Sequence, residues 1–275
     1  MIKIIYRTLL SLIILLLIIT VYLSTIGLKT DKFNTKIISQ IKKVEPNVEL
    51  RLNDVSATLD PFNLSINLKT IGTDLIYKNK IIGIETIKSK ISIKSLLNDK
   101  FSLTEISIST KSLIIKDLIT FIRLLNNDPK LFIAEKIIKK GYVVADLKLE
   151  FDDSGNIIKN YKFNGLVKDG KIDFFKKFNL NKIDFIFEIN EKIQRFNNIK
   201  ITLNKNDILI PELVASKKEK EYSIFGKLNT NNTRILKNEI KHFINKNDSA
   251  FDIQEILFSS KNDFKFVINK NFKLK

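Results

Sequence analysis

The chain has no cysteine, no tryptophan and a single histidine among its 275 residues. Without cysteine, no disulfide can staple the fold and no thiolate site can hold zinc. His242 stands in Lys241-His242-Phe243 without a carboxylate cluster nearby in sequence, so a solvated or half-buried histidine is a better interpretation than a metal ligand. The side chains that thiol and imidazole chemistry need are therefore nearly absent.

Arginine is scarce as well. Five arginines leave 42 lysines among the 47 basic residues, and the formal net charge is +17. Arginine is the preferred reader of phosphates and bases, and the lysines are spread along the chain instead of forming a block. The sequence argues against a nucleic-acid partner, and attraction to anionic lipid headgroups fits the charge better.

Motifs of familiar catalytic chemistry are missing too. There is no P-loop, no G-x-G-x-x-G and no G-x-S-x-G. The stretch Asp152-Asp153-Ser154-Gly155-Asn156 faintly resembles a calcium loop but lacks its spacing and its final glutamate, so a hairpin turn is the better interpretation. We therefore expect no catalytic residues, no cofactor and no metal site, and we predict that the chain is not an enzyme.

What the sequence does have is one long hydrophobic run. Residues 8–28, TLLSLIILLLIITVYLSTIGL, carry no charge between Arg7 and Lys29. As a helix they would rise about 31 Å, which matches the roughly 30 Å hydrocarbon core of a bilayer. A signal peptide is the alternative, but its apolar region is shorter, about 7–15 residues, and Tyr22–Gly27 offers no clean cleavage site. We predict an uncleaved, single-pass transmembrane helix.

The charges that flank this run do not orient it. Two basic side chains precede it and three, Lys29, Lys32 and Lys36, follow it, which is nearly a tie under the positive-inside rule. Long domains translocate largely regardless of charge, whereas a seven-residue head is easily left behind. We expect residues 1–7 in the cytoplasm and the long tail outside it.

Beyond the run, one short helix and many strands are expected. Residues 29–46 predict an amphipathic helix that Pro46 ends. From residue 47 to 275 the dominant period is two, as in Leu64-Ser65-Ile66-Asn67-Leu68, which is typical of antiparallel strands with one apolar and one wet face. We count about twelve strands, with helical insertions near 118–140 and 233–245. Within the first insertion Asp128-Pro129 predicts a helix cap and restart, and Gly141 is predicted to end the insertion.

The low glycine content argues against closure of this sheet into a barrel. Eight glycines are few for a tight barrel, whose corners usually need glycine or bulges. The predicted fold is mainly β with a few helices: a transmembrane helix followed by an elongated, curved, open antiparallel sheet. Twelve strands would extend about 58 Å, and a helix, a second sheet or a lipid must cover the apolar strip.

The order of these elements carries a family resemblance. After the anchor and the short helix come Leu59-Asp60-Pro61-Phe62 and Leu64-x-Ile66-x-Leu68, then Ser89–Lys94 closed by Ser95-Leu96-Leu97, Leu103–Ser109 ahead of Leu113-Ile114-Ile115, Asn164-Gly165-Leu166-Val167, and Tyr222–Leu228. This pattern, over about residues 1–230, resembles the N-terminal module of the AsmA-like family, which includes TamB-like and YhdP-like members.

The resemblance implies an inner-membrane protein of a Gram-negative envelope, with its bulk in the periplasm. It implies a taco-shaped β-groove lined with apolar side chains, and a part in outer-membrane lipid homeostasis through phospholipid movement between the membranes. Members thought to bridge the periplasm are much longer, and about 58 Å of sheet is too short to reach the outer membrane alone. The chain is then the N-terminal part of a longer protein or a short member that works with partners.

If the strip is a lipid groove, its inward residues would contact acyl chains. The candidates are Leu64, Ile66, Leu68, Ile91, Ile93, Ile106, Ile108, Phe185, Phe187, Ile199, Ile201, Tyr222 and Ile224. The alternative is that these residues bury one another or lie under the helices. The leading functional hypothesis is phospholipid binding or transfer. The other is a structural or adaptor envelope protein that recruits protein partners through exposed β edges, without lipid transfer.

Overall fold

The computed structural model describes residues 2–31, 34–44, 46–53, 55–77, 80–97, 103–125, 128–152, 157–158, 160–174, 178–218, 221–237 and 254–269. The chain forms two compact units. Unit 1 comprises Met1–Lys111 and Asp146–Lys162, and unit 2 comprises Ser112–Ala145 and Phe163–Lys275. Most described residues lie in strands, so the protein is mainly β with a few helices, as the alternation predicts.

The described residues form five helices and fourteen strands. The helices are α1 (Ile2–Thr25), α2 (Asn34–Val44), α3 (Ile93–Leu97), α4 (Ile115–Leu125) and α5 (Pro129–Ile137). The strands are β1 (Leu28–Thr30), β2 (Val48–Arg51), β3 (Val55–Asp60), β4 (Ser65–Tyr77), β5 (Lys80–Ser92), β6 (Leu103–Thr110), β7 (Leu113–Ile114), β8 (Ile138–Glu150), β9 (Lys162–Phe174), β10 (Phe178–Ile189), β11 (Ile193–Leu203), β12 (Asn206–Lys218), β13 (Glu221–Leu236) and β14 (Glu255–Asn269).

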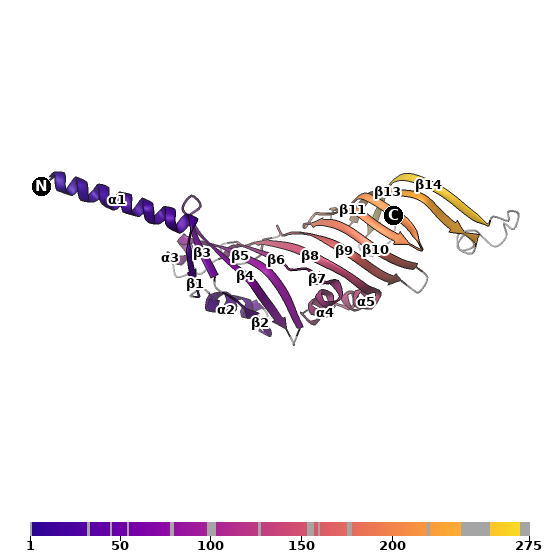
Figure 1. Cartoon of the computed structure of the whole chain (residues 1–275), viewed down its shortest axis with the longest axis horizontal. Helices are drawn as coiled ribbons and strands as arrows, with labels where there is room; N and C mark the ends of the chain where they lie inside the picture. The colour runs from indigo at the N-terminus through magenta and orange to yellow at the C-terminus, as the bar shows by residue number, and fades with distance from the viewer. Residues whose placement is uncertain are drawn as a thin grey trace. The chain divides into compact units, whose positions relative to one another are not determined.

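The strands build one large antiparallel sheet that is curved and not closed into a barrel (Figure 1). Its order runs β1-β3-β4-β5-β6-β8 and then strand by strand to β14, while β2 pairs with β4 and β7 pairs with β8 beside this path. Neighbours in the sheet are mostly neighbours in the chain, because antiparallel strands need only short turns between them. The prediction of an open, curved antiparallel sheet is confirmed.

Helix α1 is the long apolar helix that the sequence predicts, but it lies nearer the N-terminus than 8–28. It ends at Thr25, because Gly27 adopts a φ of +70° and its N–H bonds back to Tyr22 O at 3.1 Å. Leu28 already belongs to β1. The stretch Lys3–Thr25 is long and apolar enough to cross a membrane, and the rest of the described chain buries none of it.

The hydroxyl groups of α1 find partners within the helix. The Thr20 hydroxyl donates to Leu16 O at 2.8 Å, and the Ser24 hydroxyl donates to Thr20 O at 2.7 Å. A bilayer core offers no water to such groups, so internal pairing is what a spanning helix requires. These contacts fit α1 as a membrane-spanning segment.

The amphipathic helix expected at 29–46 is shorter in the structure. Strand β1 takes its first residues: Leu28 lies opposite Ala57 and Thr30 opposite Val55 of β3. Because backbone pairing with β3 satisfies this segment as a strand, the helix starts only at Asn34. It then packs through Ile37 against the core of unit 1.

The insertion expected at 118–140 contains two helices, α4 and α5. Asp128 caps α5 as expected, because its carboxylate accepts the N–H of Lys130 at 2.8 Å. The two helices are joined through Glu135, which accepts the Thr120 hydroxyl at 2.8 Å and forms an ion pair with Arg123 at 2.7 Å. The hydrogen bond from Thr120 and the Arg123 charge hold the pKa of Glu135 below its ordinary value.

Gly141 does not end this insertion, contrary to the prediction. Strand β8 begins at Ile138, and Gly141 lies within it with a φ of +138°. A Cβ at this position would collide with Ile115 of α4 and crowd Gly170 of β9. The glycine is needed for the close approach of backbone and helix, a role that a sequence pattern does not distinguish from a helix cap.

The prediction of a helix at 233–245 is wrong for residues 233–236. Strand β13 continues through Thr233 to Leu236, which lies opposite Glu255 of β14. Pairing with a strand from further along the chain decides this segment, and apolar spacing alone cannot show that pairing. Residues 238–245, which include His242, lie outside the described residues.

The curvature of unit 2 arises at β-bulges. Register shifts recur from β9 to β13, and four of the residues there with positive φ are Asp169, Lys182, Asn198 and Asn232. A bulge adds one residue to a strand, bends it and increases its twist. Asn and Asp tolerate positive φ better than most residues, so a glycine-poor chain can still bend its sheet.

Candidate functional site

In unit 1, the strand register collects most of the predicted groove residues on one face. Ile66 lies opposite Ile91, and Leu68 lies opposite Ser89, which in turn lies opposite Ile106. Directly opposed residues point to the same side of a sheet. The predicted residues on this face are Ile66, Leu68, Ile91, Ile106 and Ile108.

Other side chains of unit 1 cover this face around Leu68 and Ile91. Val55, Leu68 and Ile91 are buried together, and Ile37 of α2 packs against them. Leu68 and Ile91 therefore offer almost no surface to a ligand in this structure. In this part of unit 1 the apolar residues bury one another beneath a helix, which is the alternative to a lipid groove.

Two predicted residues do not lie on strands. Leu64 ends the turn Pro61–Leu64 between β3 and β4, with a φ of +46° and a side chain that is 65% exposed. Ile93 begins α3, and its N–H donates to Leu64 O at 2.9 Å. The apolar alternation continues into the turn before β4 and into the start of α3, so the strands predicted from it are too long.

In unit 2, a second apolar face spans strands β9 to β14. Phe187 lies opposite Gly165 and Phe196, and Ile224 lies opposite Ala215 and Phe266. The predicted residues on this face are Phe185, Phe187, Ile199, Ile201, Tyr222 and Ile224. The face also carries residues that were not predicted to line it: Phe163, Phe196, Leu213, Phe264 and Phe266. We call this surface the phenylalanine face.

The rings of this face contact one another across and along the strands. The ring centroids lie 5.0 Å apart for Phe163–Phe187, 5.9 Å for Phe185–Phe196 and 5.9 Å for Phe264–Phe266. Aromatic pairs at such distances attract beyond the effect of area burial. The alternation Phe264-Lys265-Phe266 could have revealed two of the missed residues from sequence, whereas Phe196 has no such pattern.

The phenylalanine face lacks a covering layer over β11–β14 in the described part of unit 2. Along these four strands only Ile199, Gly226 and Thr233 are buried. By contrast, β4 and β5 of unit 1 have five buried positions each. Side chains on one sheet face become buried only when a second layer packs on it, so these aromatic and aliphatic groups remain half-exposed.

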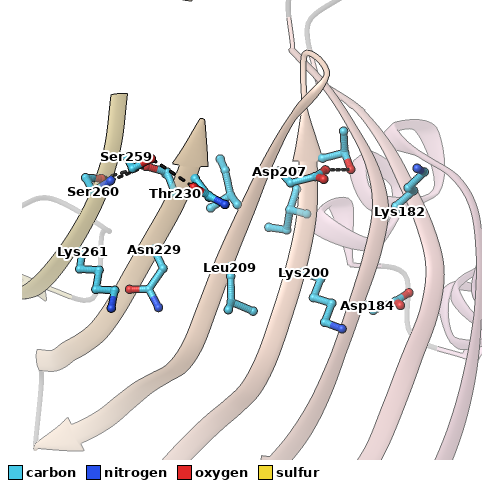
Figure 2. Close-up of a pocket in the computed structure, with 14 residues that line it drawn as sticks. Lys182, Asp184, Lys200, Asp207, Leu209, Asn229, Thr230, Ser259, Ser260 and Lys261 are labelled. Atoms are coloured by element: carbon cyan, nitrogen blue, oxygen red, sulfur yellow. Dashed lines mark hydrogen bonds between the residues drawn. The ribbon is translucent and has the colours of Figure 1, made fainter. Parts of the chain in front are cut away.

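The opposite face of the same strands is polar and contains a hollow of about 700 Å³ (Figure 2). One row of directly opposed residues crosses it from β10 to β14: Asp184, Lys200, Leu209, Asn229 and Lys261. Figure 2 shows these five side chains at one level across the strands. The sheet of unit 2 is thus amphipathic.

Asp184 of this row stabilises the sheet itself. Its carboxylate accepts the N–H of the bulge residue Asp169 at 2.8 Å and forms an ion pair with Lys168 at 2.6 Å. Partial burial raises the pKa of Asp184, but the hydrogen bonds from Lys168 and Asp169 outweigh it and hold the pKa below its ordinary value. This carboxylate is therefore engaged in the fold.

Among the described residues, no group of three or more His, Cys, Asp or Glu side chains is arranged to hold a metal ion. The arrangement presents a broad apolar surface on one face of the sheet and polar side chains on the other, which suits binding of an amphipathic molecule.

Searches against family models, curated proteins and solved structures found no match to this chain. The resemblance to AsmA-like proteins therefore stays a prediction from the sequence.

Proposed function

We propose that the protein is anchored in the inner membrane of a Gram-negative envelope by α1, with the bulk of the chain in the periplasm. In this proposal the phenylalanine face binds phospholipid acyl chains and passes phospholipid between membranes, as part of outer-membrane lipid homeostasis. The observation that carries the proposal is the half-exposed state of this face over β11–β14.

The energetic basis is burial of hydrocarbon. Each methylene of an acyl chain that leaves water contributes about 0.8 kcal/mol. Half-exposed rings such as Phe185 and Phe196 would lose further apolar area to water when covered by an acyl chain. The polar opposite face, with Lys200 and Lys261, keeps the sheet soluble while the apolar face is occupied.

Two neighbouring residues give a matched test. Phe185 lies on the phenylalanine face, whereas the adjacent Ile186 points to the polar face and is exposed. We expect Phe185→Glu to lower the phospholipid that co-purifies with the full chain several-fold, because a carboxylate in contact with acyl chains would lose its hydration. Ile186→Glu adds the same charge and should retain the lipid. Mass spectrometry of extracted lipid measures both.

A photoreactive phenylalanine analogue supplies the second readout. Placed at Phe185, it should crosslink to phospholipid in membranes, and placed at Ile186 it should not. Protein that purifies without lipid, or equal crosslinking at the two positions, would contradict the proposal. Circular dichroism of each variant shows whether the strands are retained.

An adaptor function is the second candidate, favoured by the edge of the sheet. β14 is the last strand in the order of the described sheet and is 15 residues long, so it forms an edge of that sheet. Such an edge can accept an added strand from another protein. This function predicts stable protein partners, and it predicts that Phe185→Glu does not change the binding of those partners.

A further inference from the structure

The turn between β3 and β4 exposes apolar side chains in unit 1. The Phe62 side chain is 98% exposed and that of Leu64 is 65% exposed. Helix α3, which follows β5, adds Leu97 at 80% exposure. Soluble surfaces seldom group bulky apolar side chains in this way without a partner.

The strand register places these residues at one end of the sheet. Asp60, which precedes the turn, lies opposite Ser65, and Ser65 lies opposite Ser92 at the end of β5. The N–H of Ile93 in α3 donates to Leu64 O at 2.9 Å. The turn and α3 are therefore adjacent at this end.

The same end meets the C-terminal end of α1. β1 runs antiparallel to β3, with Leu28 opposite Ala57, so β3 advances from Ala57 to Asp60 toward the end of α1. Three residues of strand cover about 10 Å. A Cβ on Gly27 would meet Ala57 O, so the backbones already touch there. Figure 1 shows β3 and α3 beside the end of α1.

The turn holds Phe62 outward in a defined shape. The Asp60 carboxylate accepts the Asn63 N–H at 3.1 Å and the Asn63 side-chain amide at 2.8 Å. Lys90 lies 3.7 Å from the same carboxylate. Leu64 adopts a positive φ that is unusual for a bulky residue, and such a conformation persists only when its surroundings impose it.

We propose that the Phe62–Leu64 turn and Leu97 form a second membrane contact, which inserts into the bilayer interface beside α1. The partner is a lipid surface because this apolar group lies at the end of the sheet where α1 ends, and Ile26, directly after the predicted membrane span, is also exposed. The exposed lysines Lys29 and Lys94 suit anionic headgroups. The inference rests on the proposed anchoring of α1, and it adds that unit 1 is seated on the membrane at one end.

The absence of cysteine makes a direct test possible. Single variants Phe62→Cys, Leu97→Cys and Ile81→Cys of the full chain would carry a nitroxide label in vesicles of phosphatidylethanolamine and phosphatidylglycerol. Ile81 is the matched control, since it is 60% exposed and apolar but lies at the opposite end of the β4–β5 hairpin. Leu15→Cys reports on α1. The measurement is the ratio of two collision rates of the label. One is with oxygen, which concentrates in the bilayer, and the other is with a nickel chelate, which stays in water.

We expect labels at positions 62 and 97 to show an oxygen-to-nickel ratio several-fold above that at position 81. Equal ratios at the three positions, with the label at 15 in the bilayer, would overturn the inference and leave the anchor intact. A water-exposed label at 15 would overturn both the anchor and the inference. Loss of lipid crosslinking at Phe185 with inserted labels at 62 and 97 would defeat the acyl-chain proposal alone.

Discussion

At the scale of single residues, two glycines fit beneath phenylalanine rings on the phenylalanine face. Phe187 lies over Gly165 and Phe264 lies over Gly226, each pair directly opposed on neighbouring strands. Glycine usually weakens a strand because it has no side chain to pack. Here the ring from the next strand covers the gap, so the aromatic residue and the glycine stabilise the sheet as a pair.

This pairing predicts the effect of a single methyl group. Gly226→Ala would place Cβ against the Phe264 ring, and we expect a loss of about 1–3 kcal/mol in the free energy of unfolding, as for other overpacked sites. Gly83→Ala is the matched control, because its Cβ would meet only the flexible Lys111 side chain, at 3.2 Å, and should change stability by less than about 0.5 kcal/mol. Urea unfolding in detergent measures both, and an equal effect at the two sites would refute the pairing.

Asp184 makes a pH-dependent contribution. Its pKa is lower in the folded protein than the ordinary value of 3.8, so its ionised form stabilises the fold above that pH. The contribution is lost as the pH falls below 3.8 toward the lowered pKa. We expect Asp184→Asn to be less stable than the unaltered protein at pH 7, with the difference shrinking in acid.

Unfolding curves between pH 7 and pH 3 measure this difference. Asp263→Asn, an exposed carboxylate on β14, is the control and should show no comparable effect. A difference for Asp184→Asn that stays constant with pH would show that the charge of Asp184 does not stabilise the fold.

At the scale of elements, α1 is the longest of the described helices. Its stretch Lys3–Thr25 is long and apolar enough to cross a membrane, and the rest of the described chain covers none of it. A charged residue at the centre of a spanning helix costs about 2.5–3.5 kcal/mol, whereas the same residue near the helix start can reach the interface.

We therefore expect Leu16→Arg to reduce the fraction of chain retained in membranes after a carbonate wash, and Thr8→Arg to leave it unchanged. The mass of the purified protein supplies the companion measurement, because an uncleaved anchor keeps residues 1–25. A mature protein that lacks these residues would mean that α1 acts as a signal peptide.

Element types were more predictable than element ends. Alternation at Ile66 and Leu68 predicted a strand correctly, and Asp128 before Pro129 marked the start of α5. The misplaced ends share a cause: β1 begins at Leu28, Gly141 lies within β8, and Leu236 is a strand residue. Each of these is set by pairing with a segment distant in sequence, which no local pattern contains.

At the scale of the whole molecule, the two units use the same strand pattern with different results. In unit 1 the apolar face receives α2, and Val55, Leu68 and Ile91 become a closed core. In unit 2 the face continues over β11–β14 without a covering layer in the described residues. One pattern of apolar alternation thus produces a filled core in one place and a half-exposed apolar surface in another.

By itself, the sequence determined the long apolar helix, the mainly β fold and the two-faced character of its strands, because these follow from local composition and from periods of two and 3.6 residues. Only the tertiary structure decided which apolar side chains are covered, where the bulges bend the sheet, and that Leu64 lies in an exposed turn near α1. These outcomes depend on contacts between segments far apart in the chain. Register and burial are properties of such contacts and are not carried by either segment alone.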